Sequence, residues 1–232
     1  MSCILHIETS TTVCSVALSF DGGIVFDRIS YEGPSHAALL GVYIEETIAF
    51  LKEMRPKPDA VALSSGPGSY TGLRIGTSIA KGLCMGWDVP LMAIPTLQLM
   101  ALQANRRYGV NDCLYCAMID ARRMEVYSAI YDASLSTVRD TSADIVTPEL
   151  FQTYLERGTV CFFGNGAAKC RSVITSDHAV FLDDIHPLAQ DMVTLAEKSL
   201  QLMKFEDTAY FEPFYLKEFM ATTPKTVRRV RL

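Results

Sequence analysis

The chain has 232 residues, of which 49% are apolar and 20% charged, a composition typical of a globular protein with one large or two small domains. Its net charge of −5 argues against a nucleic-acid binder that is basic throughout, and no apolar run approaches the length of a membrane-spanning helix. The seven cysteines are odd in number and scattered, and the N-terminus lacks the basic region of a signal peptide, so we expect a cytoplasmic protein with reduced thiols.

The first half of the chain is predicted to form three strands followed by alternating helices and strands. Apolar stretches that are continuous or alternate with polar residues predict the strands, and Asp21, Gly22 and Gly23 predict a hairpin turn. The strands cover residues 3–8, 13–20, 24–31, 59–64 and 91–94. Apolar residues at three- and four-residue spacing predict amphipathic helices between and after them. The helices cover residues 36–54, 71–86 and 96–107.

The second half of the chain repeats this order. Its strands are predicted over residues 114–119, 125–131, 137–145 and 159–163. Its longer helices are predicted over residues 148–156 and 187–204. An acidic residue ends the first strand of each half, Glu8 in one and Asp120 in the other, and each half places a glycine turn after a later strand.

This duplication predicts the fold class. Two βββαβα units facing each other form an α/β, two-lobed fold of the actin/hexokinase-like (ASKHA) type, whose nucleotide cleft lies between the lobes. Residues 105–112 resemble a linker. We therefore predict an N-terminal lobe over residues 1–108 and a C-terminal lobe over 109–232, ending in a basic tail over 214–232.

The most informative segment is residues 66–76, which read Gly-Pro-Gly-Ser-Tyr-Thr-Gly-Leu-Arg-Ile-Gly. Its glycines miss the dinucleotide GxGxxG spacing by one residue, and it lacks the Lys-Ser/Thr pair of a Walker loop. A glycine turn that leads into a helix N-terminus can bind phosphate, and the acidic end of the first strand can position Mg²⁺. The alternative is a purely structural tight turn with a polar hairpin beside it. The candidate nucleotide- or phosphate-binding residues are Glu8, Ser10, Thr11, Gly66 and Gly68.

The helix predicted after this turn has a ridge of small residues at intervals of four: Gly72, Gly76, Ala80 and Cys84. Glycine inside a helix costs about 1 kcal/mol relative to alanine, so a close backbone approach is expected to offset that cost. The partner of the ridge is either the chain's own helix over 36–54 or a helix of another subunit.

Signals for metals and nucleophiles are weak. The four histidines, His6, His36, His178 and His186, show neither HxxxH nor HExxH spacing. Cys113 and Cys116 form a lone CxxC whose strand alternation predicts that the two thiols lie on opposite faces of a sheet. No catalytic residue and no metal site are predicted.

Residues 66–76, together with residues 4–11, 14–18 and 36–40, resemble the TsaB (YeaZ) family of bacterial tRNA threonylcarbamoyladenosine biosynthesis proteins, grouped with the glycoprotease or peptidase M22 proteins. The resemblance implies the two-lobed ASKHA fold and a non-catalytic paralogue of the enzyme TsaD. TsaD, with TsaB and the ATPase TsaE, moves a threonylcarbamoyl group onto N6 of adenosine 37 in tRNAs that read codons beginning with A. The implied role is a scaffold that activates TsaD, and peptidase activity is not expected.

The resemblance also implies partners and an interface. Such proteins form a heterodimer with TsaD through the helices that here cover residues 36–54 and 71–86, and they form homodimers through the same face. TsaE joins in a ternary complex, and tRNA is contacted indirectly. The interface residues implied here are Ile44, Thr47, Ile48, Leu51, Gly72, Gly76, Ile79, Ala80 and Leu83.

Two departures from the family pattern bear on ligands. Leu40 stands where TsaD-like proteins have the second histidine of a metal-binding HxxxH pair after His36, which argues against metal binding. Glu8 stands where an aspartate is usual. No cofactor is therefore expected beyond weak or vestigial binding of ATP or ADP with Mg²⁺.

Three other functions stay open at this point. An ASKHA-type ATPase or small-molecule kinase would need Glu8, Asp120 and both glycine turns to hold Mg-ATP. A metallopeptidase would need metal ligands that the histidine spacing does not supply. A generic tRNA-binding protein would use the tail, where residues 214–232 hold five basic residues and one acidic residue, a net charge of +4. A solvated terminus is the simpler interpretation of that tail.

Overall fold

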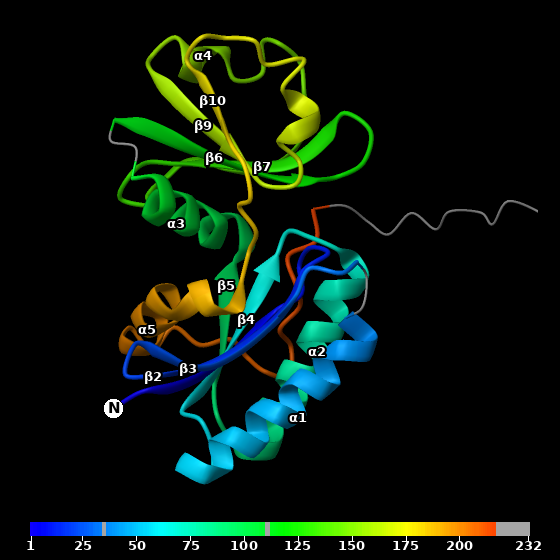
Figure 1. Cartoon of the computed structure of the whole chain (residues 1–232), viewed down its shortest axis with the longest axis vertical. Coiled ribbons are helices and arrows are strands. Elements are labelled where there is room, and N and C mark those ends of the chain that lie inside the picture. Colours follow the sequence, from blue (N-terminus) through cyan, green and yellow to red (C-terminus); the bar gives the residue numbers. More distant parts are fainter. Residues whose placement is uncertain (34–35, 110–111, 217–232) are drawn as a thin grey trace, which may run out of the picture.

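The computed structural model describes residues 1–33, 36–109 and 112–216. They form two lobes, each built on one five-stranded sheet (Figure 1). The first sheet has the strand order β3-β2-β1-β4-β5 and the second has the order β10-β9-β6-β7-β8. No helix in the described ranges has the length and apolar character needed to cross a membrane.

The first sheet confirms the predicted three-stranded beginning of the chain. Its strands are β1 (Cys3–Glu8), β2 (Cys14–Phe20), β3 (Gly23–Ser30), β4 (Ala60–Gly66) and β5 (Leu91–Pro95). Strands β1, β2 and β3 pair antiparallel, whereas β4 pairs parallel with both β1 and β5. Parallel neighbours need a crossover connection, and helices provide it here.

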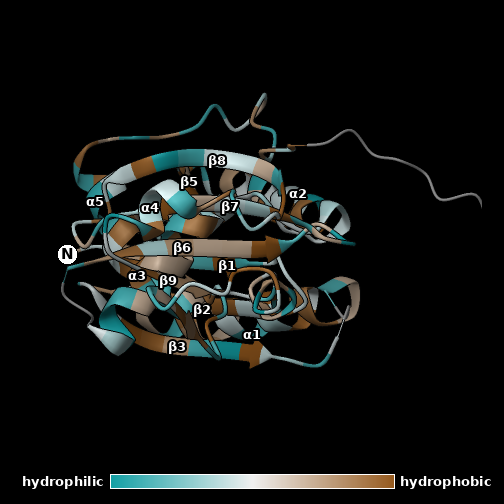
Figure 2. Ribbon diagram, turned by 90° about the horizontal axis from the view of Figure 1, so that it is seen from above, coloured by the Kyte–Doolittle hydropathy of each residue, from teal (hydrophilic) through white to brown (hydrophobic). Residues whose placement is uncertain are grey.

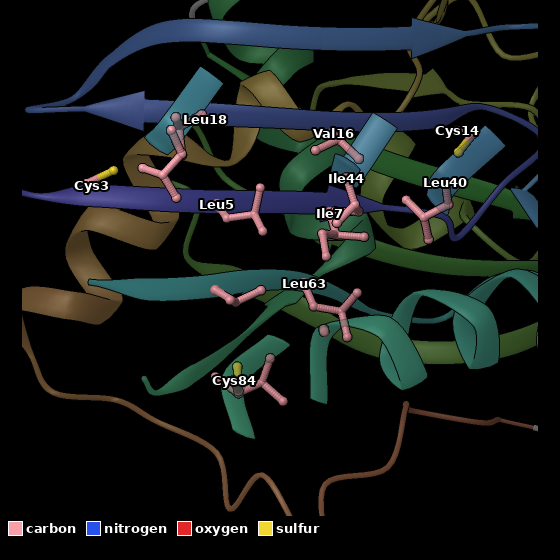
Figure 3. Packing of buried hydrophobic residues seen from close by; sticks show 14 residues of the cluster. Cys3, Leu5, Ile7, Cys14, Val16, Leu18, Leu40, Ile44, Leu63 and Cys84 are labelled. Atoms are coloured by element: carbon pink, nitrogen blue, oxygen red, sulfur yellow. The ribbon is translucent and has the colours of Figure 1, made fainter. Parts of the chain in front are cut away.

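Two helices cover one face of this sheet: α1 (His36–Met54) and α2 (Tyr70–Trp87). Every second residue of β1, namely Cys3, Leu5 and Ile7, points toward them and packs with Leu40 and Ile44 of α1 (Figure 3). This period-2 pattern on the strand and the three-to-four pattern on the helix are what the sequence showed. The apolar area buried between them stabilises the lobe by roughly 25 cal/mol per Å².

The second sheet repeats the topology. Its strands are β6 (Cys113–Asp120), β7 (Glu125–Tyr131), β8 (Thr137–Ile145), β9 (Thr159–Phe163) and β10 (Ala179–Leu182). Strand β6 takes the place of β1, since it pairs antiparallel with β7 and parallel with β9. The chain therefore has the duplicated α/β, actin/hexokinase-like fold that was predicted.

Hydropathy follows this arrangement (Figure 2). The central strands β1 and β6 are largely apolar and almost entirely buried. The edge strand β8 is polar and mostly exposed, as is usual for an edge that must not pair with other chains.

Several elements differ from the prediction in the second half. The helix predicted over 148–156 is only α4 (Gln152–Leu155), and the segment after the second glycine turn, residues 164–166, forms the 3₁₀ helix η1 (Ala168–Cys170). Strand β10 was not predicted. The last long helix is split into η2 (Ala189–Met192) and α5 (Val193–Gln201).

Two helices pack on the lobe opposite to the one expected from their position in the chain. Helix α3 (Thr96–Tyr108) packs its apolar residues Leu97, Met100 and Ala104 against the second sheet. Helix α5 packs Ala196 against Ile4 of the first sheet. The chain thus changes lobe before α3 and again before η2, rather than at residues 105–112, because each helix buries its apolar face on the sheet it can reach (Figure 1).

Candidate functional site

Three segments meet where β1 and β4 end. They contain the candidate phosphate-binding residues except Glu8, which is the last residue of β1. They are the turn after β1, the glycine turn formed by residues 66–69, and a C-terminal strap formed by residues 205–216. The Ser69 amide donates to the Ser10 carbonyl at 2.6 Å, and the Phe214 amide donates to the Ser65 carbonyl at 2.7 Å. The Gly66 amide donates to Thr96 Oγ1 at 3.1 Å, which ties the turn to the start of α3.

The glycines of this turn are required by protein atoms that lie against them. A Cβ on Gly68 would lie less than 3.0 Å from the Ser10 carbonyl oxygen. Gly66 has a φ of +102°, and a Cβ on it would lie 2.9 Å from the Phe214 carbonyl oxygen. The space beside the glycines is therefore occupied by the chain itself, which supports the tight-turn interpretation over the phosphate-binding one.

Close contacts within the chain likewise explain why glycine is needed at two positions of the ridge on α2. A Cβ on Gly72 would lie less than 3.0 Å from the Thr9 carbonyl oxygen, and a Cβ on Gly76 would lie less than 3.0 Å from Thr9 Oγ1. The ridge thus makes its close approach to the end of β1. The other half of the ridge, Ala80 and Cys84, packs in one core cluster with Leu40 and Ile44 of α1, as the first alternative predicted. Contact of the ridge with another subunit stays a prediction.

Glu8 is fully buried and does not face an open cleft. Its Oε1 accepts a hydrogen bond from the Ser10 amide at 2.5 Å, while its Oε2 has no hydrogen-bond partner among the described residues. Burial raises the pKa of this carboxyl to about 7, and hydrogen bonds from Ser10 and Ser64 only partly oppose that rise. The side chains of Ser10 and Thr11 are buried as well.

A Mg-nucleotide does not fit these residues. The hollow beside the glycine turn has a volume of about 40 Å³, whereas pockets for ligands of nucleotide size hold roughly 300–1,000 Å³. Glu8 is enclosed, and the Phe214 backbone lies over Gly66. We therefore derive no chemistry through a nucleotide at Glu8, Ser10, Thr11, Gly66 and Gly68.

The second lobe holds a counterpart of this site with different chemistry. Asp120 ends β6 as Glu8 ends β1, and the Gly166 amide donates to the Met118 carbonyl at 3.1 Å. Asp120 is exposed, however, and forms an ion pair with Lys169. The duplicated geometry predicted from the two glycine turns is present. In the second lobe, however, the ammonium group of Lys169 already neutralises the Asp120 carboxylate.

The C-terminal strap is the feature that sequence analysis missed. Its Glu206 amide donates to the Leu91 carbonyl at 2.9 Å at the edge of the first sheet. Lys81 Nζ on α2 donates to the carbonyls of Ala209 at 2.9 Å and Phe211 at 3.0 Å. An extended segment held by main-chain bonds has no periodicity, so the sequence offered no signal for it. The predicted basic tail shares residues 214–216 with the strap, and its remainder lies outside the described residues.

We expect Lys81→Met to loosen the strap without unfolding the lobe. The ammonium group makes two bonds that methionine cannot make, and their loss weakens the strap by about 1 kcal/mol. Hydrogen exchange of the Glu206 and Phe214 amides should become about fivefold faster. Lys57→Met is the matched control, because Lys57 Nζ also donates to two carbonyls, those of Trp87 and Asp88, away from the strap. Unchanged exchange in Lys81→Met would contradict this account.

Most of the predicted interface residues lie inside the chain. Burial within the chain is common to six of the nine: Ile44, Thr47, Leu51, Gly72, Gly76 and Ala80. The other three, Ile48, Ile79 and Leu83, are half-buried at the edge of the same core. Apolar periodicity selected the inward-facing stripe of each helix, so the prediction of a partner-binding surface carries over only to these three.

The outward stripe of the two helices was not singled out by the sequence. Val42 is 47% exposed on α1 and Met85 is 76% exposed on α2. A Cβ on Gly41 or Gly82 would meet nothing within 4 Å. These four residues define what we call the outer face. Two exposed glycines inside helices cost about 1 kcal/mol each relative to alanine, with no compensation within the chain.

The environments of His36, Cys113 and Cys116 are explained by packing within the fold. His36 is buried, with Nε2 3.1 Å from the Val13 carbonyl oxygen, and Leu40 packs in the core. Cys113 and Cys116 lie in different core clusters on opposite faces of β6, as predicted. Within residues 1–33, 36–109 and 112–216, no three His, Cys, Asp or Glu side chains are grouped so that they could hold a metal ion.

Comparisons with known proteins agree with the resemblance drawn from the sequence. The family model for TsaD, tRNA N6-adenosine threonylcarbamoyltransferase, matches residues 20–225. The tRNA threonylcarbamoyladenosine biosynthesis protein TsaB of Escherichia coli K12 is 31% identical over 231 residues, covering 94% of this chain and 96% of its own. The protein of the same name from Haemophilus influenzae is 29% identical, covering 92% of this chain and 93% of its own.

A solved structure matches in shape as well. YeaZ from Pseudomonas aeruginosa has a TM-score of 0.79 at 26% identity, and the match covers 93% of this chain and all of that one. The similarity therefore extends over both lobes.

Proposed function

Because this chain belongs to the TsaB (YeaZ) family, we propose that it is a non-catalytic scaffold that activates TsaD in the biosynthesis of threonylcarbamoyladenosine in tRNA. In this proposal TsaD, this chain and TsaE install N6-threonylcarbamoyladenosine at position 37 of tRNAs that read codons beginning with A. The chain works in the cytoplasm and touches tRNA only through the complex.

The surroundings of Glu8 and of the glycine turn, as far as the structure describes them, support the non-catalytic part of the proposal. Glu8 is enclosed, the glycine turn is filled by the chain's own backbone, and Leu40 stands where a metal ligand would be needed. The same observations disfavour an independent ATPase or small-molecule kinase, since such an enzyme must open a cleft for Mg-ATP. They also disfavour a metallopeptidase, because Leu40 stands where such an enzyme would need a metal ligand.

The outer face supports the scaffold part and is the observation that carries it. Gly41 and Gly82 leave room on the surface of α1 and α2, beside the exposed apolar side chains of Val42 and Met85. A helix of another subunit can approach closely there and offset the helical cost of both glycines. The half-buried Ile48 lies on α1, and Ile79 and Leu83 lie on α2. We propose that TsaD binds here and that the homodimer uses the same face.

The test is the light-scattering mass of the purified chain, alone and mixed with TsaD from the same organism. We expect a dimer that converts into a 1:1 complex. Gly82→Leu should weaken the complex at least tenfold, because its side chain fills the space that a partner helix needs. The fold should be retained, since a Cβ at this exposed position meets no atom of its own chain within 4 Å.

Gly158→Leu is the matched control, because its Cβ also meets nothing within 4 Å but it lies in the other lobe. It should leave the complex unchanged. A chain that stays monomeric and ignores TsaD would overturn the scaffold proposal. Turnover of Mg-ATP by the isolated chain, lost on Glu8→Ala, would replace the proposal with the ATPase alternative.

A further inference from the structure

The turn between β6 and β7 places two arginines where a tight turn usually has glycine or asparagine. Arg122 and Arg123 have φ angles of +72° and +52°. Two consecutive residues with positive φ are typical of the tight turns of β-hairpins, in which Asn-Gly and Gly-Gly are preferred because a Cβ strains this conformation. The chain therefore keeps two long cationic side chains at a backbone cost that glycine would avoid.

The two guanidinium groups have no hydrogen bond or ion pair with any residue that the structure describes. Both arginines are exposed, and the hydrogen bond that Arg122 does make comes from its backbone amide. Arg139 in the same sheet is different, since its guanidinium forms an ion pair with Asp144. The side chains of Arg122 and Arg123 therefore do little for the stability of the lobe, and the cost of placing them needs another explanation.

The turn is held firmly from beneath. The Ala121 amide donates to the Glu125 carbonyl at 3.0 Å, and the Arg122 amide donates to Asp120 Oδ1 at 2.9 Å. The Lys169 ammonium group donates to the Asp120 carboxylate and, at 2.7 Å, to the Glu125 carbonyl. The backbone that carries the two arginines is thus fixed before any partner arrives, which lowers the entropic cost of binding one.

Apolar side chains lie beside the arginines. Met124, the next residue, is 37% exposed, and Ile145, the last residue of β8, is 70% exposed. The Val146 amide donates to the Met124 carbonyl at 2.8 Å, which holds the end of β8 next to the turn. Arginine and methionine are both enriched in protein–protein interfaces. We use the name arginine patch for four residues: Arg122, Arg123, Met124 and Ile145.

The chemistry of the patch favours a protein segment over a nucleic acid. Carboxylates accept paired hydrogen bonds from a guanidinium group, and aliphatic side chains of the same segment can bury the exposed surface of Met124 and Ile145. The phosphates of a nucleic acid would use the arginines and leave both apolar side chains exposed to water. The matching ligand is therefore a segment that combines acidic and aliphatic residues.

We propose that the arginine patch binds an acidic segment of another protein. Carboxylates of that segment pair with Arg122 and Arg123, and an aliphatic side chain packs on Met124 and Ile145. This binding site is separate from the proposed scaffold role, which uses the outer face on the helices of the first lobe. Stable complexes bury about 800 Å² on each partner, and four residues offer less, so we expect weak and transient binding.

The test starts from random peptides of about twelve residues displayed on phage. They are selected on the full-length chain and counter-selected on the double variant Arg122→Gly/Arg123→Gly. The retained peptides should combine acidic residues with at least one aliphatic residue. The most enriched peptide is then labelled with fluorescein and titrated by fluorescence anisotropy at several salt concentrations.

Arg122→Gln and Arg123→Gln should each weaken binding of the labelled peptide at least about fivefold, the effect expected for an arginine at the centre of an interface. Ile145→Ser should also weaken binding, but without changing its salt dependence, since it removes no charge. The matched control is Arg157→Gln. Arg157 is an exposed arginine of the same lobe that lies away from the patch, and its replacement should leave binding unchanged.

Stability of the glycine variants gives an independent readout. Arg122→Gly and Arg123→Gly should unfold at a higher urea concentration than the natural chain, because glycine adopts positive φ without strain. A variant that gains stability and loses the peptide cannot have lost it by unfolding. A lower urea midpoint in both glycine variants would mean that the arginines serve the turn itself, which would overturn the proposal.

Three binding results would also overturn it: no acidic peptide retained in the selection, equal loss of binding in Arg157→Gln, or no loss in Ile145→Ser. A mixed-sequence RNA oligonucleotide that binds the chain and is lost in both glutamine variants, when no acidic peptide is retained, would assign the patch to nucleic acid instead. The mass of the TsaD complex, measured on the same variants, separates failure here from failure of the scaffold proposal.

Discussion

We expect Gly72→Ala to lower the free energy of unfolding by about 3 kcal/mol, the upper part of the usual range for overpacking a filled site. The added methyl group would overlap the Thr9 carbonyl oxygen, which is backbone and has no rotamer by which to move away. Either the N-terminus of α2 or the end of β1 must shift. Urea unfolding followed by circular dichroism measures the change, and the melting temperature should fall by roughly 6–12 °C for a chain of this size.

The matched control is Gly82→Ala on the same helix. Its methyl group meets nothing within 4 Å, so alanine should raise the free energy of unfolding by up to about 1 kcal/mol through its better helix propensity. The two substitutions are chemically identical and should have opposite signs. If Gly72→Ala proved neutral or stabilising, the close packing of α2 against the end of β1 would be wrong, and the partner-facing interpretation of the ridge would return.

The second large effect is expected from Glu8→Gln, and it depends on pH. Burial raises the pKa of Glu8 from its ordinary value of 4.5 to about 7 in the folded protein. Between those values the folded state keeps a proton that the unfolded state has released. This contribution to stability is therefore present below pH 4.5 and is lost as the pH rises toward 7. Above that range the buried carboxylate costs about 3 kcal/mol.

Glutamine removes this titration while keeping the oxygen that accepts the Ser10 amide. At pH 8 the variant should be about 3 kcal/mol more stable than the natural chain, and near pH 4.5 the two should be nearly equal. Unfolding in urea at both pH values gives the difference, in which the other titrating groups cancel. Glu45→Gln, an exposed substitution on α1, is the control for the exchange of a glutamate for glutamine outside the core. Destabilisation of Glu8→Gln at pH 8 would mean that the carboxylate is matched by a charge, as a bound cation would supply.

The Glu8→Gln substitution also bears on function. A stabilising Glu8→Gln that still supports TsaD would fit a scaffold whose former nucleotide site has been closed. The same substitution would abolish activity if Glu8 positioned Mg²⁺ for chemistry, as the ATPase alternative requires.

Local sequence was enough for much of the fold. The helix predicted over 36–54 has the observed bounds of α1, and the strands of both halves were placed correctly except β10. The effects of proline and glycine, the two-residue period of strands and the three- to four-residue period of helices all arise from residues close in sequence. They can therefore be recognised without knowledge of the rest of the chain. The duplication of the two halves, the lack of an HxxxH pair and the family resemblance through residues 66–76 also came from the sequence alone.

The tertiary structure decided which way each pattern faces. Glycines at intervals of four on a helix indicate that another segment packs closely against them, but they do not identify it. In the structure Thr9, at the end of β1, packs against Gly72 and Gly76. Burial of Glu8, the packing of α3 and α5 on opposite lobes, and the strap over the glycine turn likewise depend on contacts between residues far apart in the chain. Such contacts leave no local period, because the partner that fills a space is chosen by three-dimensional packing and not by its neighbours in sequence.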